Sequence, residues 1–258
     1  MNNNELMTIK DVSVTYIQED SGEDYTALTS TSFDIYEGDF ICLLGPSGCG
    51  KSTLLNTLAG LLEPTTGVIT MQGEEVKGIS WKRAVVFQTP TLYPWMTTYE
   101  NVAFGPKMRG VDAKETAEAV DMYLEHVGLT NFADSKPYEL SGGMRQRAAL
   151  ARVLVNNPMM IFMDEPFGAL DALTRENMQK LVRDIWRETN KTMFLITHDV
   201  DEALTLGTRV MVMSARPGRI IKEYDLDFTS RLEDGDEDVR YAEDYLKIRK
   251  EILKQIQV

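Results

Sequence analysis

The chain has 258 residues, of which 40 are Asp or Glu and 27 are Lys or Arg, and its formal net charge is −13. Its 43% hydrophobic residues suffice for a buried core, which excludes a disordered tail, and its length corresponds to one or two domains. Two cysteines are too few for a disulfide framework, and the acidic balance disfavours general nucleic-acid binding. No run approaches the ~20 apolar residues of a membrane helix, and Met1–Lys10 lacks the apolar region of a signal peptide.

Acidic side chains are concentrated in two stretches. The first, 19–24, contains four acids and no base, and the second, 223–244, contains ten acids opposed only by Arg231 and Arg240. Outside these stretches acids and bases nearly balance, so the body of the protein is close to neutral. We interpret both stretches as solvated surface that favours solubility; a partner-binding role for the second stretch is the alternative.

Short apolar runs mark the predicted strands. β-rich runs lie at Ile9–Tyr16 and Val68–Met71. Uninterrupted apolar runs, which suit parallel strands buried on both faces, lie at Phe40–Leu44, Ala84–Phe87, Met159–Met163, Thr192–Thr197 and Val210–Met213. Helical patterns follow two of these runs, at Lys51–Leu62 and Leu173–Thr189. This alternation predicts an α/β fold with a mostly parallel sheet.

The middle of the chain, 98–157, has helical patterns and no strand-like run. Helices are predicted over Asp112–Val127 and Gly142–Val155. In the first of them, apolar residues recur at helical spacing on one face, namely Ala113, Ala117, Val120 and Leu124. We therefore expect an all-helical insertion in the α/β core.

A glycine-rich segment follows the predicted strand Phe40–Leu44. It reads Gly45-Pro46-Ser47-Gly48-Cys49-Gly50-Lys51-Ser52, and it matches the phosphate-loop pattern G-x-x-x-x-G-K-[ST] between a strand and a helix. Backbone N–H groups of such a loop and the helix N-terminus converge on phosphate oxygens. We expect Lys51 to reach the β- and γ-phosphates of a nucleotide and the Ser52 hydroxyl to hold Mg²⁺. The alternative is a chance glycine-rich turn.

Two carboxylates, Asp164 and Glu165, end the apolar run Met159–Met163. The carboxyl end of a strand faces the ligand crevice of an open α/β sheet. We expect Asp164 to orient Mg²⁺ and Glu165 to polarise the water that attacks the nucleotide. Without a phosphate loop in the same chain, this pattern would indicate only a strand entering a loop.

A third motif, Leu140-Ser141-Gly142-Gly143-Met144-Arg145-Gln146-Arg147, resembles the signature of ATP-binding cassette (ABC) ATPases. The other motifs of that family are present in the family's order along the chain. Gln88 resembles the Q-loop, Ala169-Leu170-Asp171 the D-loop, and His198 the switch histidine. Tyr16 resembles the aromatic residue that stacks on adenine, with Tyr25 as its competitor. The resemblance extends over about Leu6–Tyr224.

The resemblance implies a P-loop NTPase core of the RecA-like type, with a mostly parallel sheet, an N-terminal antiparallel β subdomain and an all-helical insertion subdomain. We accordingly expect a single ABC ATPase domain over 1–258. The ATP-binding core would comprise 1–88 and 158–222, the helical subdomain with the signature 89–157, and an acidic C-terminal tail 223–258.

The resemblance also implies an ATPase that uses ATP and Mg²⁺. Catalytic roles then belong to Glu165, His198 and Gln88, and the metal ligands are Ser52, Gln88 and Asp164. Nucleotide binding is expected at Tyr16, Gly45, Pro46, Ser47, Gly48, Cys49, Gly50, Lys51, Ser52, Thr53, Ser141, Gly142, Gly143 and Asp171. The family solution is a head-to-tail homodimer with two ATP molecules, in which the signature of one copy completes the phosphate loop of the other.

Among ABC proteins, the motor subunit of a membrane transporter is the favoured class. Chromosome and repair ATPases carry a long coiled coil between phosphate loop and signature, but only about ninety residues separate Ser52 from Ser141. Translation-type factors carry two cassettes in one chain. The transporter class implies a peripheral location at the cytoplasmic face of the cell membrane, membrane-spanning permease subunits, an extracytoplasmic solute-binding protein and no nucleic-acid partner.

Import is favoured over export because Gln88–Val102 resembles the corresponding segment of bacterial importers. Its Pro-broken loop carries apolar residues that we expect to receive a membrane subunit, namely Leu92, Tyr93, Trp95 and Met96. Gly168–Arg175 and Met213–Ile220 resemble the nitrate, sulfonate and taurine importer ATPases, whose relatives carry thiamine precursors. An ABC exporter subunit and a non-transport P-loop ATPase or kinase are the alternatives.

Several side chains capable of other chemistry are predicted to be structural. We expect Cys42 in the core, and Cys49 to be a small residue that fits the phosphate loop, with a redox switch as the alternative. His126 is interpreted as ordinary surface. Three methionines are interpreted as core residues rather than metal ligands, namely Met159, Met160 and Met163.

Overall fold

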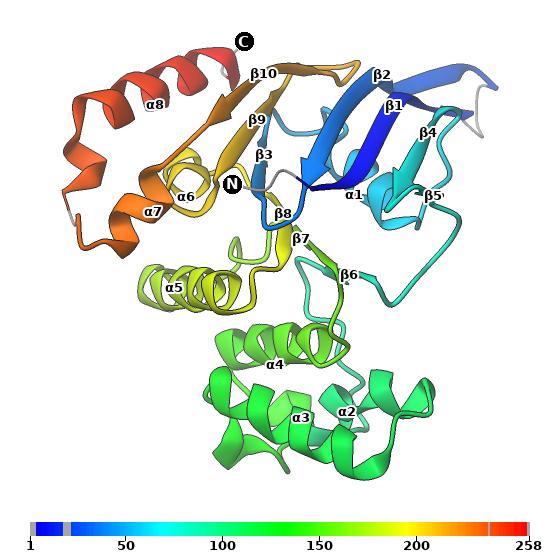
Figure 1. The fold of residues 1–258 in the computed structure, drawn as a ribbon, viewed down its shortest axis with the longest axis vertical. Coiled ribbons are helices and arrows are strands. Elements are labelled where there is room, and N and C mark those ends of the chain that lie inside the picture. Colours follow the sequence, from blue (N-terminus) through cyan, green and yellow to red (C-terminus); the bar gives the residue numbers. More distant parts are fainter. Residues whose placement is uncertain (1–3, 18–21, 237, 257–258) are drawn as a thin grey trace. The chain divides into compact units, whose positions relative to one another are not determined.

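The computed structural model of the chain describes residues 4–17, 22–236 and 238–256. Glu19, Asp20 and Glu237 of the two acidic stretches lie outside the described residues. The chain divides into two compact units (Figure 1). The first unit is Met1–Ser80 with Asn190–Val258, and the second unit is Trp81–Thr189.

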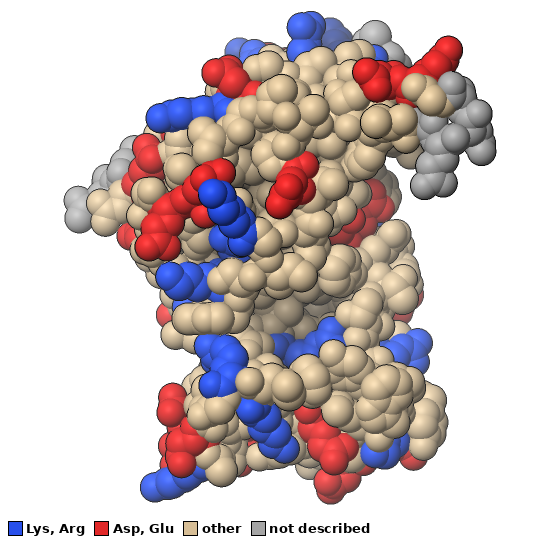
Figure 2. Space-filling view, turned by 90° about the vertical axis from the view of Figure 1, so that its right-hand side faces the viewer, with Lys and Arg blue, Asp and Glu red and all other residues tan. Residues whose placement is uncertain are grey.

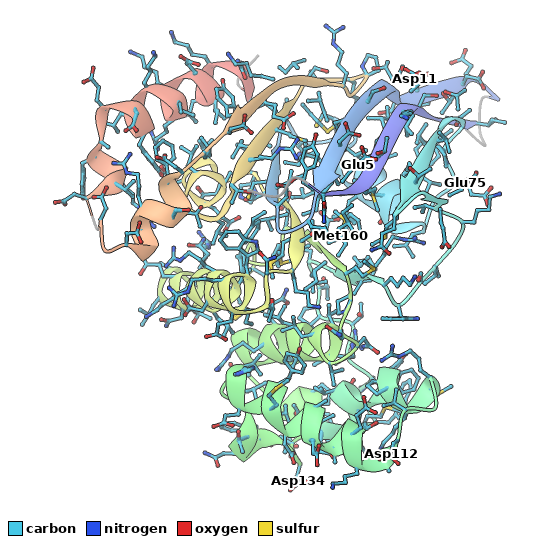
Figure 3. The ribbon with its side chains drawn as sticks, in the orientation of Figure 1. Glu5, Asp11, Glu75, Asp112, Asp134 and Met160 are labelled. Atoms are coloured by element: carbon cyan, nitrogen blue, oxygen red, sulfur yellow. The ribbon has the colours of Figure 1, made fainter. Side chains whose placement is uncertain are left out.

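An antiparallel sheet with the strand order β2-β1-β4-β5 forms one part of the first unit. Its strands are β1 (Glu5–Ile17), β2 (Asp24–Tyr36), β4 (Thr66–Met71) and β5 (Glu74–Glu75). Strands β1 and β4 confirm the two predicted β-rich runs. Asp11, labelled on β1 in Figure 3, has a φ of 50° where the register between β1 and β2 shifts. The sequence does not predict β2, because its many Thr and Ser residues leave no clear alternation of apolar and polar residues.

Four further strands of the first unit run in the order β10-β9-β3-β8. They are β3 (Phe40–Leu44), β8 (Thr192–Ile196), β9 (Arg209–Met213) and β10 (Ile220–Asp225). Strand β3 pairs in parallel with β8 and β9, and β10 joins β9 in the antiparallel direction. All residues of β3 and β8 are buried, which confirms the prediction of parallel strands covered on both faces.

Two helices of the first unit start directly after these strands. Helix α1 (Lys51–Ala59) packs against β8 and β2, and α6 (Val200–Leu206) packs against β3. Helix α1 ends before the predicted Leu62, because Gly60 adopts the left-handed conformation (φ 79°) and donates its N–H to the carbonyls of Asn56 and Thr57.

The residues of the expected acidic tail are folded. Beyond β10 they form α7 (Phe228–Glu233), the short 3₁₀ helix Val239–Tyr241 and α8 (Glu243–Ile256), drawn in orange to red in Figure 1. The Tyr245 side chain of α8 is buried, and its ring centroid lies 5.1 Å from that of Phe228. Acidic side chains stay at the surface, where Asp236 and Asp244 pair with Arg231. On the face drawn in Figure 2, acidic and basic side chains are interspersed.

A bidentate ion pair fastens α8 to α6. Arg249 donates from Nε and Nη2 to the two carboxylate oxygens of Asp201, at 2.8 and 2.9 Å, and the Tyr245 hydroxyl donates to the same carboxylate at 2.9 Å. These hydrogen bonds, those from Arg249 foremost, hold the pKa of Asp201 below its ordinary value. Since α6 starts immediately after His198 and Asp199, α8 supports the segment that carries the predicted switch histidine.

Arg249→Gln is expected to lower the free energy of unfolding at pH 7 by about 1 kcal/mol, because Asp201 is partly exposed and the pair is screened by solvent. A carboxylate with a depressed pKa contributes stability above its unfolded pKa of about 4 and loses it as the pH falls through the folded pKa. The difference between wild type and variant should therefore shrink below about pH 4. Urea unfolding at pH 7 and pH 3 measures this difference in the free energy of unfolding. The control is Lys250→Gln, which changes an exposed neighbour on α8. A difference that grows with acidity would contradict the assignment.

The second unit combines two parallel strands with helices. The strands β6 (Arg83–Val86) and β7 (Met160–Asp164) match the predicted runs within a residue at each end. The helices are α2 (Thr98–Met108), α3 (Ala113–His126), α4 (Gly142–Leu154) and α5 (Ala172–Thr189), with 3₁₀ turns at Thr130–Phe132 and Pro137–Glu139. The described residues between 98 and 157 contain no strand, as predicted.

Local capping explains where these helices begin. Asp112, labelled in Figure 3, accepts hydrogen bonds from the N–H groups of Lys114 and Glu115 and caps α3. The buried face of α3 includes Val120 and Leu124, as expected, but Ala113 is exposed because it lies in the first turn, beyond the packed part of the helix. Within the described ranges, no helix is long and apolar enough to cross a bilayer.

Candidate functional site

The phosphate loop closes around its own lysine. It connects β3 to α1, as predicted. Lys51 is 7% exposed, and its Nζ donates to the carbonyl oxygens of Gly45 and Pro46 at 2.8 and 2.9 Å. Gly50 has a φ of 102°, and a Cβ there would lie 2.7 Å from the Ala27 carbonyl oxygen, so only glycine fits. The loop thus places a cation and the first N–H groups of α1 together, an arrangement that binds phosphate.

The cysteines do not have the environment of reactive thiols. Cys49 is buried in the loop, and burial raises the pKa of its thiol, which keeps it protonated and unreactive. Burial likewise raises the pKa of Cys42, which lies in β3. Both observations agree with the structural interpretation and not with a redox switch.

Tyr16, rather than Tyr25, lies beside the start of α1. The Tyr16 hydroxyl is 3.4 Å from Thr53 Oγ1, and 39% of Tyr16 is exposed. Tyr25 sits opposite Tyr16 in the β1–β2 register, but its ring faces Arg216, whose guanidinium carbon is 5.7 Å from the ring centroid. Tyr16 therefore presents an exposed ring next to the phosphate-loop helix.

His198 lies at the same edge of the sheet as the phosphate loop. It follows β8, which is parallel to β3, so both segments leave the sheet at the carboxyl ends of neighbouring strands. The turn around it is ordered: Asp199 donates its N–H to Thr197 Oγ1 at 3.0 Å and accepts from the N–H groups of α6. The His198 side chain is exposed.

In the second unit, the acid pair and Gln88 lie together. Asp164 ends β7, and Gln88 follows the parallel neighbour β6. A Cβ on Gly168 would lie 3.8 Å from both Gln88 Nε2 and Glu165 Oε2, so these two polar groups converge around that glycine. Glu165 has a φ of 44°, a left-handed conformation that is uncommon outside glycine.

The signature segment opens α4. Ser141 is the N-cap, and its hydroxyl accepts from the Met144 N–H at 3.2 Å. Ser141 and Gly142 are exposed, whereas Gly143 is buried, and a Cβ on Gly143 would lie 2.5 Å from Thr174 Cγ2. The start of this 13-residue helix therefore exposes Ser141 and Gly142 to solvent, and the helix N-terminus there favours an anion.

Asp171 stands next to the signature helix through the same threonine. Its carboxylate accepts from the Thr174 N–H at 3.0 Å, and this backbone hydrogen bond lowers its pKa. Thr174 thus contacts both the D-loop residue Asp171 and the signature residue Gly143. The D-loop and the signature segment, which both carry predicted nucleotide-binding residues, therefore adjoin one another in the second unit.

The residues predicted to bind Mg²⁺ would do so through oxygen atoms. Within the described part of the chain, no group of three or more His, Cys, Asp or Glu residues could hold a metal ion. The predicted ligands Ser52, Gln88 and Asp164 offer a hydroxyl, an amide oxygen and a carboxylate, the hard donors that suit Mg²⁺. A nucleotide would supply the further oxygens through its phosphates.

One residue beside the phosphate loop is not predicted from the sequence. Arg216 Nε donates to the Gly48 carbonyl at 2.7 Å, a contact between residues 168 positions apart. The sequence holds no signal for this contact, because a side chain in a turn shows no periodicity.

Known proteins resemble this chain over most of its length. The family model described as "ABC transporter" matches residues 28–168. The "Taurine import ATP-binding protein TauB" of Jannaschia sp. is 50% identical over 251 residues, which is 97% of this chain and 93% of the relative. The protein of the same name from Pelagibacter ubique is 51% identical over 91% of this chain and 89% of its own.

Solved structures resemble the fold. "Dimeric structure of a post-hydrolysis state of the ATP-binding cassette MJ0796 bound to ADP and Pi" has a TM-score of 0.75 and 32% identity, covering 86% of this chain and 99% of that one. CbiO1 from Clostridium perfringens, described as part of the ABC transporter complex cbiONQ, has a TM-score of 0.78 and 26% identity, covering 96% and 100%.

Proposed function

The chain belongs to the ABC transporter family and is an ABC ATPase, and we propose that it powers an importer for taurine or a closely related sulfonate. The observation that carries the proposal is the 50% identity to a taurine-import ATP-binding protein over 97% of this chain. The resemblance to the nitrate, sulfonate and taurine subgroup is thereby confirmed. The exporter and kinase alternatives receive no support.

We propose the following roles in nucleotide binding. Tyr16 supports adenine, and the loop amides, Lys51 and Thr53 bind the phosphates. Ser52, Gln88 and Asp164 would hold Mg²⁺, which neutralises phosphate charge when bound. The remaining loop contacts come from Gly45, Pro46, Ser47, Gly48, Cys49 and Gly50. The buried ammonium of Lys51, which donates hydrogen bonds to the carbonyl groups of Gly45 and Pro46, supports this assignment.

Hydrolysis then depends on Glu165. Its carboxylate would accept a proton from the attacking water, while Gln88, whose amide converges with it around Gly168, would position that water. His198 would hydrogen-bond the γ-phosphate from the edge where β8 ends. The protein supplies positioning and charge neutralisation, which account for most of phosphoryl-transfer catalysis.

The signature of a second copy completes the site in this proposal. Ser141, Gly142 and Gly143 would bind the γ-phosphate held by the partner's phosphate loop, and Asp171, which lies next to them, would take part in the same nucleotide site. The exposed N-terminus of α4 and its neighbour Asp171 support a role at a surface between copies.

Ser141→Arg is expected to leave ATP binding by the monomer unchanged and to abolish cooperative hydrolysis, because the long cation blocks the partner's phosphates. Equilibrium nucleotide binding and ATPase rate against protein concentration measure the two effects. Ser230→Arg, an exposed serine on α7, is the matched control. Cooperative hydrolysis by Ser141→Arg would rule out the proposed composite site.

The loop after Gln88 is built to present an apolar surface. Asn101 is fully buried and fixes the loop, donating to the carbonyls of Tyr93, Met96 and Thr97. Lys136 Nζ donates to the Trp95 carbonyl at 3.0 Å, while the Trp95 side chain is 68% exposed. We propose that Trp95 contacts the permease, since an ordered loop with an exposed indole is typical of a binding surface.

Trp95→Ala is expected to weaken association with the permease by about 2 kcal/mol, the loss typical of an aromatic hot spot, and to reduce transport-coupled hydrolysis. ATPase activity of the isolated subunit should not change. Co-purification and uptake assays measure the effect, and Tyr241→Ala, which removes an exposed ring from the first unit, is the control. Unchanged assembly and transport would refute the contact.

The proposed complex is tested by reconstitution. A homodimer of this chain should assemble at the cytoplasmic face of the membrane with permease subunits and a solute-binding protein. Taurine, nitrate and a thiamine precursor are compared as stimulants of ATP hydrolysis in proteoliposomes. Stimulation by taurine alone supports the proposal. Stimulation by nitrate or the thiamine precursor, without stimulation by taurine, would contradict the proposed substrate. The single-domain organisation with core, helical and C-terminal parts remains part of this proposal.

A further inference from the structure

A cavity of about 750 Å³ lies in the first unit beside the β9–β10 turn. The turn, β2, β10 and the end of α8 contribute its walls. The lining residues are Thr29, Ser214, Ala215, Arg216, Pro217, Arg219, Ile221, Lys254 and Gln255. Its size suits a small organic molecule.

The charge of this cavity is opposite to that of the protein. Arg216, Arg219 and Lys254 line it, and no Asp or Glu among the residues that the structure describes does, although the chain carries a net charge of −13. Among the described residues, neither Arg219 nor Lys254 forms an ion pair. Three cations around one hollow, none of them paired with a carboxylate of the described ranges, favour an anionic ligand.

Apolar atoms form most of the cavity surface, although Thr29, Ser214 and Gln255 add polar groups. Ala215 and Pro217 lie in the turn, and Ile221, which is 40% exposed, lies on β10. Apolar walls with a few charged groups that fix orientation are typical of sites for organic ligands. The chemistry therefore fits an anion that also carries an apolar portion better than an inorganic ion.

Arg216 joins this cavity to the phosphate loop. Its Nε donates to the Gly48 carbonyl at 2.7 Å. The turn is held there by Gly218, which donates its N–H to the Ala27 carbonyl and approaches so closely that a Cβ would lie 2.0 Å from the Cys49 carbonyl oxygen. An anion that draws the guanidinium toward the cavity would alter the phosphate loop directly.

We propose that this cavity is a regulatory site for an organic anion, whose binding weakens ATP binding through Arg216. The bound anion competes with the Gly48 carbonyl for the guanidinium and neutralises a cation next to the nucleotide phosphates. Because linkage is reciprocal, ATP weakens anion binding by the same factor.

Binding is tested with 8-anilinonaphthalene-1-sulfonate, a fluorescent anion with an apolar body, titrated into the full chain without nucleotide. Arg219→Gln/Lys254→Gln is expected to raise the Kd of the probe at least about ten-fold, since two charge-assisted contacts are lost. The control, Lys222→Gln/Lys250→Gln, removes the same charge from exposed positions of β10 and α8 and should change the Kd less than about two-fold. Equal effects of the two variants would overturn the proposal.

Coupling is tested by measuring the Kd of ATP with and without saturating probe. The probe should raise the Kd of ATP about three-fold in the wild type, and the Arg219→Gln/Lys254→Gln variant should show no such rise. No change in the wild type, or tighter ATP binding, would overturn the link through Arg216. An equal rise in both proteins would place the probe in the nucleotide site and also overturn the proposal. Neither measurement depends on transport or on the identity of the imported solute.

Discussion

Glu165→Gln is expected to reduce ATP turnover at least about 100-fold while leaving ATP affinity within about two-fold of wild type, because the amide keeps the shape of the side chain but cannot accept a proton. ATP should then accumulate unhydrolysed and stabilise the dimer. Phosphate release and nucleotide binding measure the two quantities separately, and size-exclusion chromatography with ATP measures the dimer.

The control for this prediction is Glu176→Gln, which makes the same chemical change at an exposed position of α5 in the same unit. Its turnover should match the wild type. If Glu165→Gln turned over ATP at the normal rate, Glu165 could not be the proton acceptor, and the convergence of Gln88 and Glu165 around Gly168 would need another explanation.

Lys51→Ala is expected to weaken ATP binding about 10- to 100-fold, because it removes the charge-assisted hydrogen bonds to phosphate. The structure adds a second cost: the carbonyl groups of Gly45 and Pro46 lose the donor that now satisfies them. The loop should therefore be less ordered in the variant even without nucleotide. Equilibrium binding of a fluorescent ATP analogue measures the affinity, and amide hydrogen exchange measures the loop.

The matched variant is Lys77→Ala, an exposed lysine of the first unit that pairs with Glu75. It should bind ATP like the wild type. Wild-type ATP affinity in Lys51→Ala would contradict the role of the loop. Together the two predictions separate binding from chemistry, since one variant loses affinity and the other loses turnover.

The sequence predicts the central strands well because burial on both faces leaves a simple signal. Strands such as β3 and β8 therefore stand out in the sequence as short apolar runs. Strand β2 has one polar face and is rich in Thr and Ser, so its pattern is weak. Helix α8 is harder still: its fully buried side chains are Tyr245 and Ile252, one heptad apart in a charged segment.

The candidate site follows a similar rule. Local motifs carry their own context, so the phosphate loop, the acid pair and the helix start at Ser141 can be placed from the sequence. Contacts between distant segments cannot. The hydrogen bonds from Arg216 to Gly48 and from Arg249 to Asp201 depend on how turns and helices pack in the folded protein. No local sequence pattern indicates these pairings.

The left-handed backbone at Glu165 has a consequence for how this protein can vary. A side chain in that region of φ costs about 1 kcal/mol relative to glycine, which adopts it freely. The chain therefore gives up some stability to keep a carboxylate at the end of β7. Folding alone would favour glycine at this position, whereas the proposed role in hydrolysis requires an acid. In that proposal the most stable sequence and the active sequence are different sequences.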